Sequence, residues 1–136
     1  MEFAALAAWV LSAIVGSHLL TIWIRQGGLR EQSTKVTRFP RLVVTGHPVA
    51  AVAGLVVWVA YLATGEAGYA WAAFGTLLVV IFQGFLLFTR WLVGRGGRHA
   101  RGAEQDFPAT AVVMHGVVAV ATFVLVFLTA IEVSRP

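Results

Sequence analysis

The sequence predicts an all-α membrane protein, a single domain of four transmembrane helices in an antiparallel bundle, built by tandem duplication of a two-helix hairpin. The chain of 136 residues is 59% hydrophobic and only 12% charged, with a mean hydropathy of +0.83. Its apolar residues form four segments of about 20 residues without Lys, Arg, Asp or Glu, the length that crosses a hydrocarbon core roughly 30 Å thick. The predicted spans are residues 3–24, 42–64, 69–89 and 109–131.

The second half of the chain repeats the first at an offset of 68 residues, so that residues 1–68 and 69–136 are two copies of one unit. About a quarter of the aligned positions are identical, without a gap. The identical positions include residue types that two Val- and Ala-rich segments would not align by chance: Phe39-Pro40 with Phe107-Pro108, His47 with His115, Gly16 with Gly84, Trp23 with Trp91 and Arg30 with Arg98. Both copies cross the membrane in the same directions, which predicts a pseudo-twofold axis along the membrane normal.

Basic residues predict the orientation. Nine of the 10 Lys and Arg residues lie in the connections 25–41 and 90–106, whereas the short connection at Gly65 to Gly68 carries only Glu66. The positive-inside rule therefore places the two long connections in the cytoplasm and both termini outside. The net charge of +4 is explained by these loops and anionic lipid, so it does not indicate nucleic-acid binding. The Arg-rich, Lys-poor composition with abundant Ala, Val and Gly indicates a GC-rich bacterial genome, so the predicted location is a bacterial cytoplasmic (inner) membrane.

Aromatic residues and prolines are expected to mark the ends of the spans. Phe39-Pro40 and Phe107-Pro108 precede the second and fourth spans, where proline is tolerated because the first helical turn lacks a partner for its N–H. Six aromatic residues are expected to form belts at the two interfaces: Trp23 and Trp91 on the cytoplasmic side, and Trp58, Tyr61, Tyr69 and Trp71 on the outer side. The absence of cysteine excludes disulfides and iron–sulfur ligation.

Three histidines fall at one depth in the membrane. His47, His115 and His18 each lie six or seven residues inside a predicted cytoplasmic boundary, which is about 10 Å at the helical rise. Ionisable side chains at such depth are costly and indicate function, usually facing the bundle interior. His47 and His115 are the pair that the duplication relates, so a twofold axis between the second and fourth spans would point them at each other.

A facing pair of imidazoles suits a six-coordinate haem iron, with the macrocycle nearly parallel to the membrane normal. Flat porphyrin requires small residues beside it, and the sequence offers Gly16 and Gly84 on the first and third spans and Gly54 on the second. Close helix packing would also explain these small residues. The propionates would then point toward the cytoplasmic arginines as charge partners. The arginines nearest that boundary are Arg25, Arg38, Arg41 and Arg90.

With His47, His115, Gly16 and Gly84 in these positions, the chain resembles the membrane b-type cytochromes, in which a four-helix bundle holds haem b through histidines on two helices. The resemblance is architectural and covers the four spans. It implies electron transfer with a quinone or a partner redox subunit, which we expect to dock on the connections 25–41 and 90–106. No histidine lies in the outer half, so a second stacked haem is not expected. A subunit of a larger complex is therefore favoured over a stand-alone enzyme, and oligomerisation stays open.

Two alternatives are compatible with the same residues. His18 has Leu86 as its counterpart in the second copy, and it lies about 200° around the helix from Gly16, so only one of the two faces the core. If His18 faces inward, three imidazoles in one layer would suit Zn or Cu, which predicts a metal transporter or membrane metalloenzyme. If the histidines only join helices, the protein is a non-catalytic scaffold subunit. Gln83, the other polar residue deep in a span, would form an interhelical hydrogen bond or contact quinone.

Overall fold

The computed structural model describes residues 1–30, 39–95 and 102–135. These residues form four long α-helices and one short 3-10 helix, η1. Their bounds are α1 Glu2–Arg25, α2 Arg41–Thr64, α3 Ala67–Gly94, η1 Ala103–Asp106 and α4 Ala109–Val133. All four α-helices are long and apolar enough to cross a membrane, which confirms the predicted all-α, four-span fold.

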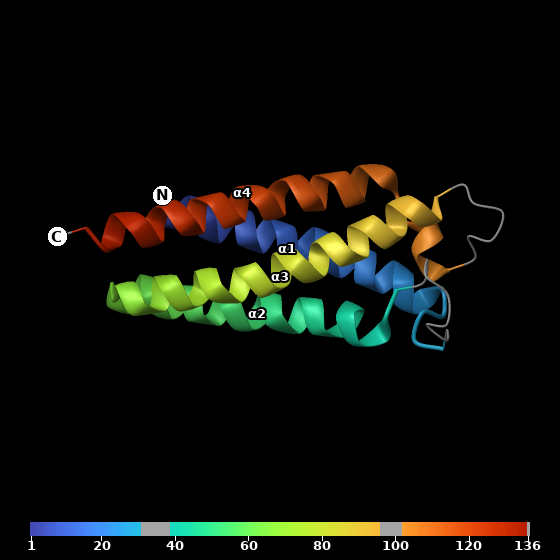
Figure 1. Ribbon diagram of the computed structural model, residues 1–136, viewed down its shortest axis with the longest axis horizontal. Helices are drawn as coiled ribbons and strands as arrows, with labels where there is room; N and C mark the ends of the chain where they lie inside the picture. Colours follow the sequence, from blue (N-terminus) through green and yellow to red (C-terminus); the bar gives the residue numbers. More distant parts are fainter. Residues whose placement is uncertain (31–38, 96–101, 136) are drawn as a thin grey trace.

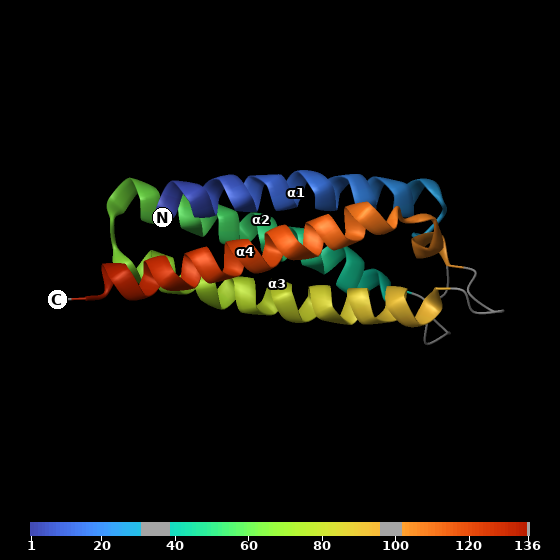
Figure 2. The ribbon, with the colours of Figure 1, turned by 90° about the horizontal axis from the view of Figure 1, so that it is seen from above.

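The helices pack as an antiparallel bundle in which chain neighbours are also spatial neighbours (Figures 1 and 2). In the described part of the chain, the backbone of α1 lies close to α2 and α4, and that of α3 lies close to the same two helices. The diagonal pairs α1/α3 and α2/α4 have no such close backbone approach there. Both termini lie at the end that carries the α2–α3 turn, opposite the two long connections (Figure 1). The 68-residue offset of the repeat relates α1 to α3 and α2 to α4. The two most closely packed pairs, α1–α4 and α2–α3, are therefore equivalent in the two copies.

Local sequence explains where the helices begin and end. Pro40 and Pro108 stand directly before α2 and α4, and their carbonyl oxygens accept hydrogen bonds from the first helical turns. At the other end of α2, Gly65 adopts a φ of +72°, a left-handed conformation that favours glycine, and donates its N–H to the Tyr61 carbonyl at 2.8 Å. Helix α3 runs five residues beyond its predicted end at 89, because Trp91 and Gly94 are buried against neighbouring elements.

Most of the helical surface is apolar and exposed. Large side chains such as Leu42, Phe82 and Val49 are 84%, 71% and 68% exposed. The buried side chains occupy only a narrow part of each helix. Outward-facing apolar side chains of this density are compatible with contact to lipid tails, since in a bilayer they need no cover from protein.

The buried core consists of two clusters separated along the bundle. One fills the half that carries the termini, around Trp9, Trp58 and Tyr61. The other lies at the end with the long connections, and its members are Leu19, Trp23, Phe39, Val44, Trp91, Ala103 and Val112. The layer between the two clusters contains the paired histidines.

The aromatic-belt prediction was wrong for four of the six residues. Trp23, Trp91, Trp58 and Tyr61 are 1%, 3%, 0% and 5% exposed, so their rings fill the bundle interior. Tyr69 and Trp71 are the two that lie exposed, at 39% and 41%. Trp58 and Tyr61 share their cluster with four buried alanines, Ala5, Ala70, Ala73 and Ala130, whose small side chains leave space that large rings fill.

Candidate cofactor site

His47 on α2 and His115 on α4 face each other across the bundle although their helices are diagonal. Their ring centroids are 6.1 Å apart, and the ring planes are inclined by 75°. A second pair of repeat mates, Phe39 and Phe107, also meets, with centroids 5.8 Å apart. Each pair joins equivalent positions of the two copies, so both pairs lie where a twofold axis between the copies would pass.

Each histidine packs against the glycine of the adjacent helix. A Cβ atom added to Gly16 on α1 would lie 2.9 Å from Cε1 of His115, which is too close without displacement of the ring. A Cβ added to Gly84 on α3 would lie 3.4 Å from Cε1 of His47. The two glycines identified in the sequence therefore make room for the two imidazoles, and Gly16 does so under the tighter constraint.

Ser12 orients the ring of His115. Nδ1 of His115 lies 3.0 Å from the Ser12 carbonyl oxygen and 3.3 Å from the Ser12 hydroxyl. A carbonyl oxygen only accepts, so Nδ1 carries the proton and Nε2 keeps its lone pair, the arrangement that suits a metal-ligating histidine. Ser12 is one helical turn before Gly16 on the same face of α1. That spacing was the sequence signal for it, and our sequence analysis missed it.

The environment of His47 differs at the same point. Its Nδ1 is buried and has no hydrogen-bond partner among the described residues. The position equivalent to Ser12 in the second copy is Val80, which has no hydroxyl. The backbone of Val80 interacts with the His47 ring as that of Ser12 does with the His115 ring, but it makes no hydrogen bond of good geometry to Nδ1. The two histidines are therefore related by sequence but not equally held.

The histidines line an apolar cavity of about 570 Å³ between the four helices. This volume lies within the range of small-molecule and cofactor sites. Trp23, Trp91, Phe39 and Phe107 line its end toward the long connections, and Trp9, Leu77 and Thr122 line the opposite end. Val52, Val117 and Phe85 belong both to its wall and to the exposed surface, so the cavity reaches the faces of the bundle that lipid would cover.

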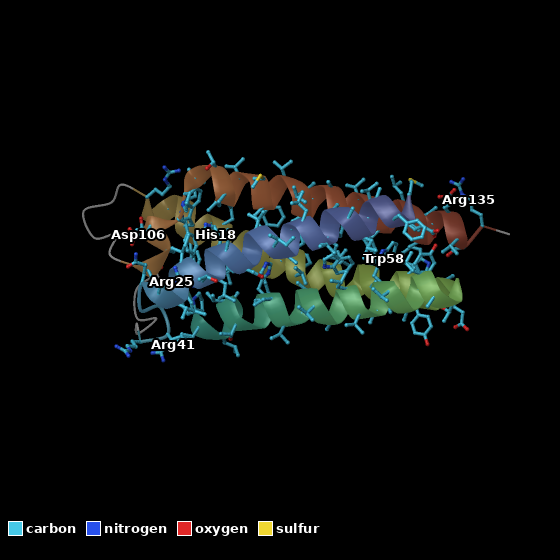
Figure 3. All side chains as sticks on the ribbon, turned by 180° about the vertical axis from the view of Figure 1, so that it is seen from behind. His18, Arg25, Arg41, Trp58, Asp106 and Arg135 are labelled. Atoms are coloured by element: carbon cyan, nitrogen blue, oxygen red, sulfur yellow. The ribbon has the colours of Figure 1, made fainter. Side chains whose placement is uncertain are left out.

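The other candidate residues lie outside the cavity wall. Gly54 is two turns from His47 and packs against Trp9 and Thr76, where an added Cβ would lie 2.9 Å from the Trp9 ring. Arg41 is exposed at the start of α2, and Arg90 is half-buried near the end of α3. Arg25 lies at the same end of the bundle, opposite to Trp58 and Arg135 (Figure 3). Arg38 lies outside the described residues.

His18 does not join the paired histidines. It is exposed on α1, whereas Gly16 faces inward against His115, which settles the alternative that the sequence left open. Within the described ranges, no group of three His, Cys, Asp or Glu side chains is placed to hold a metal ion. The three-imidazole arrangement considered for Zn or Cu is therefore not assembled there.

Two further polar residues lie inside the bundle. Gln83 on α3 does not line the cavity, and its Oε1 is buried without a hydrogen-bond partner in the part of the chain that the structure describes. Glu104 of η1 is fully buried at the end with the long connections. Its burial could not be predicted from the sequence, because nothing in a polar loop shows which side chain folds inward.

No family model, curated protein or solved structure matches the chain.

Proposed function

We propose that this protein binds one haem b between His47 and His115 and carries electrons within the membrane. The observation that supports the proposal is the placement of two imidazoles from diagonal helices, 6.1 Å apart, in an apolar cavity. Bis-histidine ligation needs one imidazole on each face of the macrocycle. Two histidines on diagonal helices would approach the macrocycle from opposite faces, whereas two on neighbouring helices would more readily approach it from the same face.

The separation of the rings suits a shared metal ion. Two metal–nitrogen bonds of about 2.0 Å, together with about 1 Å from each nitrogen to its ring centroid, add up to about 6 Å. The 75° between the ring planes does not conflict with this, because two imidazoles that share a metal ion need not be coplanar. The separation of the rings is therefore compatible with His47 and His115 holding haem iron between them.

The cavity lining suits the rest of the group. Its wall is almost entirely apolar, which matches the porphyrin faces. At the end toward the long connections, Trp23 Nε1 is buried without a hydrogen-bond partner among the described residues. This N–H is a donor for a propionate, and Arg25, Arg41 and Arg90 lie at the same end to balance its charge.

The haem would supply reversible one-electron chemistry, and the chain's residues would control access to it. The apolar wall keeps water from the site and disfavours extra positive charge there. Trp9, Trp58 and Tyr61 fill the half that carries the termini, so electrons would enter and leave at the basic end. A quinone or a redox subunit would dock on the connections 25–41 and 90–106, of which residues 31–38 and 96–101 lie outside the described chain.

The visible spectrum of detergent-purified protein from haem-replete cells tests the proposal. We expect a sharp Soret band and, after dithionite reduction, the α and β bands of low-spin haem b, with one haem per chain. Colourless protein without metal would overturn the proposal in favour of a scaffold. Colourless protein with stoichiometric Zn or Cu would overturn it in favour of a metal-handling protein.

We also propose that the protein lies in a bacterial cytoplasmic membrane with both termini outside. The natural chain has no cysteine, so single cysteines report the topology without background. Glu66→Cys, in the α2–α3 turn, should react with a membrane-impermeant maleimide in intact cells. Gln26→Cys, after α1, should react only once the membrane is permeabilised. The reverse labelling pattern would show the opposite orientation.

A further inference from the structure

The two copies hold their histidines with different strength. His115 has an Nδ1 bonded to Ser12 at 3.0 Å and a ring pressed against Gly16. His47 has a buried Nδ1 that makes only a loose contact with the Val80 backbone, and its ring fits less closely against Gly84. A hydrogen bond at the distal nitrogen fixes ring orientation and makes an imidazole a stronger ligand. On these grounds His115 is the better placed of the two ligands.

The backbone beneath His47 adds to this difference. Pro48 follows His47 inside α2, and a proline at that position has no N–H to donate to the carbonyl of Val44, four residues earlier. Helix α2 is therefore one hydrogen bond short in the turn that carries His47. The equivalent residue in the second copy is Gly116, which keeps its N–H, so α4 does not share this weakness.

Resting on the proposed haem site, we propose that His115 is the anchoring ligand and His47 the exchangeable one, so that the reduced site takes a diatomic ligand such as carbon monoxide on the His47 side. With haem bound, His47 Nε2 would release the ferrous iron and carbon monoxide would bind the iron through its carbon in place of that nitrogen, while His115 would stay bound. The exchange would transfer no electron. The cavity that both rings line reaches the bundle surface, so a small diatomic ligand would have a path to the site.

His47→Gly and His115→Gly separate the two roles. We expect His47→Gly to retain haem within about twofold of the wild type, as a high-spin form that binds carbon monoxide. In His115→Gly, the haem content per chain should fall at least about tenfold below that of the wild type. Haem is measured per chain by the pyridine haemochrome assay, and helical content by circular dichroism. Equal losses, or a greater loss in His47→Gly, would overturn the inference.

A second variant pair keeps both ligands and so does not depend on how a histidine deletion folds. Val80→Ser introduces beside His47 the hydroxyl that Ser12 provides beside His115, and should lower the carbon monoxide affinity of the reduced protein by about tenfold. Val79→Ser, on the exposed face of the same helix, is the control and should leave the affinity unchanged. Unaltered affinity in Val80→Ser would contradict the inequivalence while leaving haem binding intact. Haem-free wild type would instead remove the proposed function, and this inference with it.

Discussion

Replacing His115 with leucine is expected to give a folded protein whose haem content per chain is at least about tenfold below that of the wild type. His18→Leu is expected to retain the low-spin spectrum. His115 points into the cavity and is fixed by Ser12, while His18 is exposed on the outer surface of α1. Leucine is already present at the position equivalent to His18 in the second copy, Leu86. The paired variants therefore change the same residue type at one depth, and differ in the direction of the side chain.

The measurement is the reduced-minus-oxidised spectrum of each variant, normalised to protein, with a redox titration of His18→Leu. Circular dichroism and gel filtration in detergent verify that both variants keep the bundle. If His18→Leu loses the haem and His115→Leu retains it, the ligand pair includes α1. His47 and His115 would then only pack helices α2 and α4 together and would not be the haem ligand pair.

Gly16→Leu is expected to close the site from the side of α1. A single Cβ at this position would already lie 2.9 Å from Cε1 of His115, so the imidazole has to move, and the remaining leucine carbons would extend into the cavity beside it. We expect haem per chain to fall by at least about tenfold. Gly84→Ala, where the added Cβ would be 3.4 Å from the His47 ring, should have a smaller effect.

Gly75→Leu is the matched control for this substitution. Gly75 is exposed on α3, and an added Cβ has no neighbour within 4 Å, so leucine there adds the same volume on the lipid side. Haem content should be unchanged in Gly75→Leu, and thermal stability in detergent should be similar. A Gly16→Leu protein with full haem content and an unaltered spectrum would show that haem is held elsewhere than beside His115.

The number and extent of the spans follow from composition alone, because a bilayer demands long uncharged segments whatever their packing. The helix bounds in the structure agree with the predicted spans at three of the four, and α3 is longer because Trp91 and Gly94, beyond the predicted end, are buried against neighbouring elements. The internal offset of 68 residues also indicated which residues to pair. His47 with His115 and Phe39 with Phe107 lie face to face, as that offset suggested.

Which face of each helix points into the bundle could not be predicted from the sequence. These helices are apolar on all sides, so hydrophobic periodicity does not distinguish the side that meets protein from the side that meets lipid. For this reason Trp23, Trp91, Trp58 and Tyr61 were assigned to the interfaces although they fill the core. The same ambiguity left His18 and Gly16 as alternatives, which the close approach of α1 to α4 resolved.

By itself, the sequence determined the four spans, the repeat, and the two histidines and two glycines that the repeat singles out, since these depend on residue type and spacing along the chain. Only the tertiary structure decided that the histidines face each other across a cavity, that His18 points away, and that Ser12 holds one ring while the other lacks such a bond. Those properties depend on the rotation of each helix about its own axis. In an apolar bundle, that rotation is set by how small and large side chains of neighbouring helices fit together.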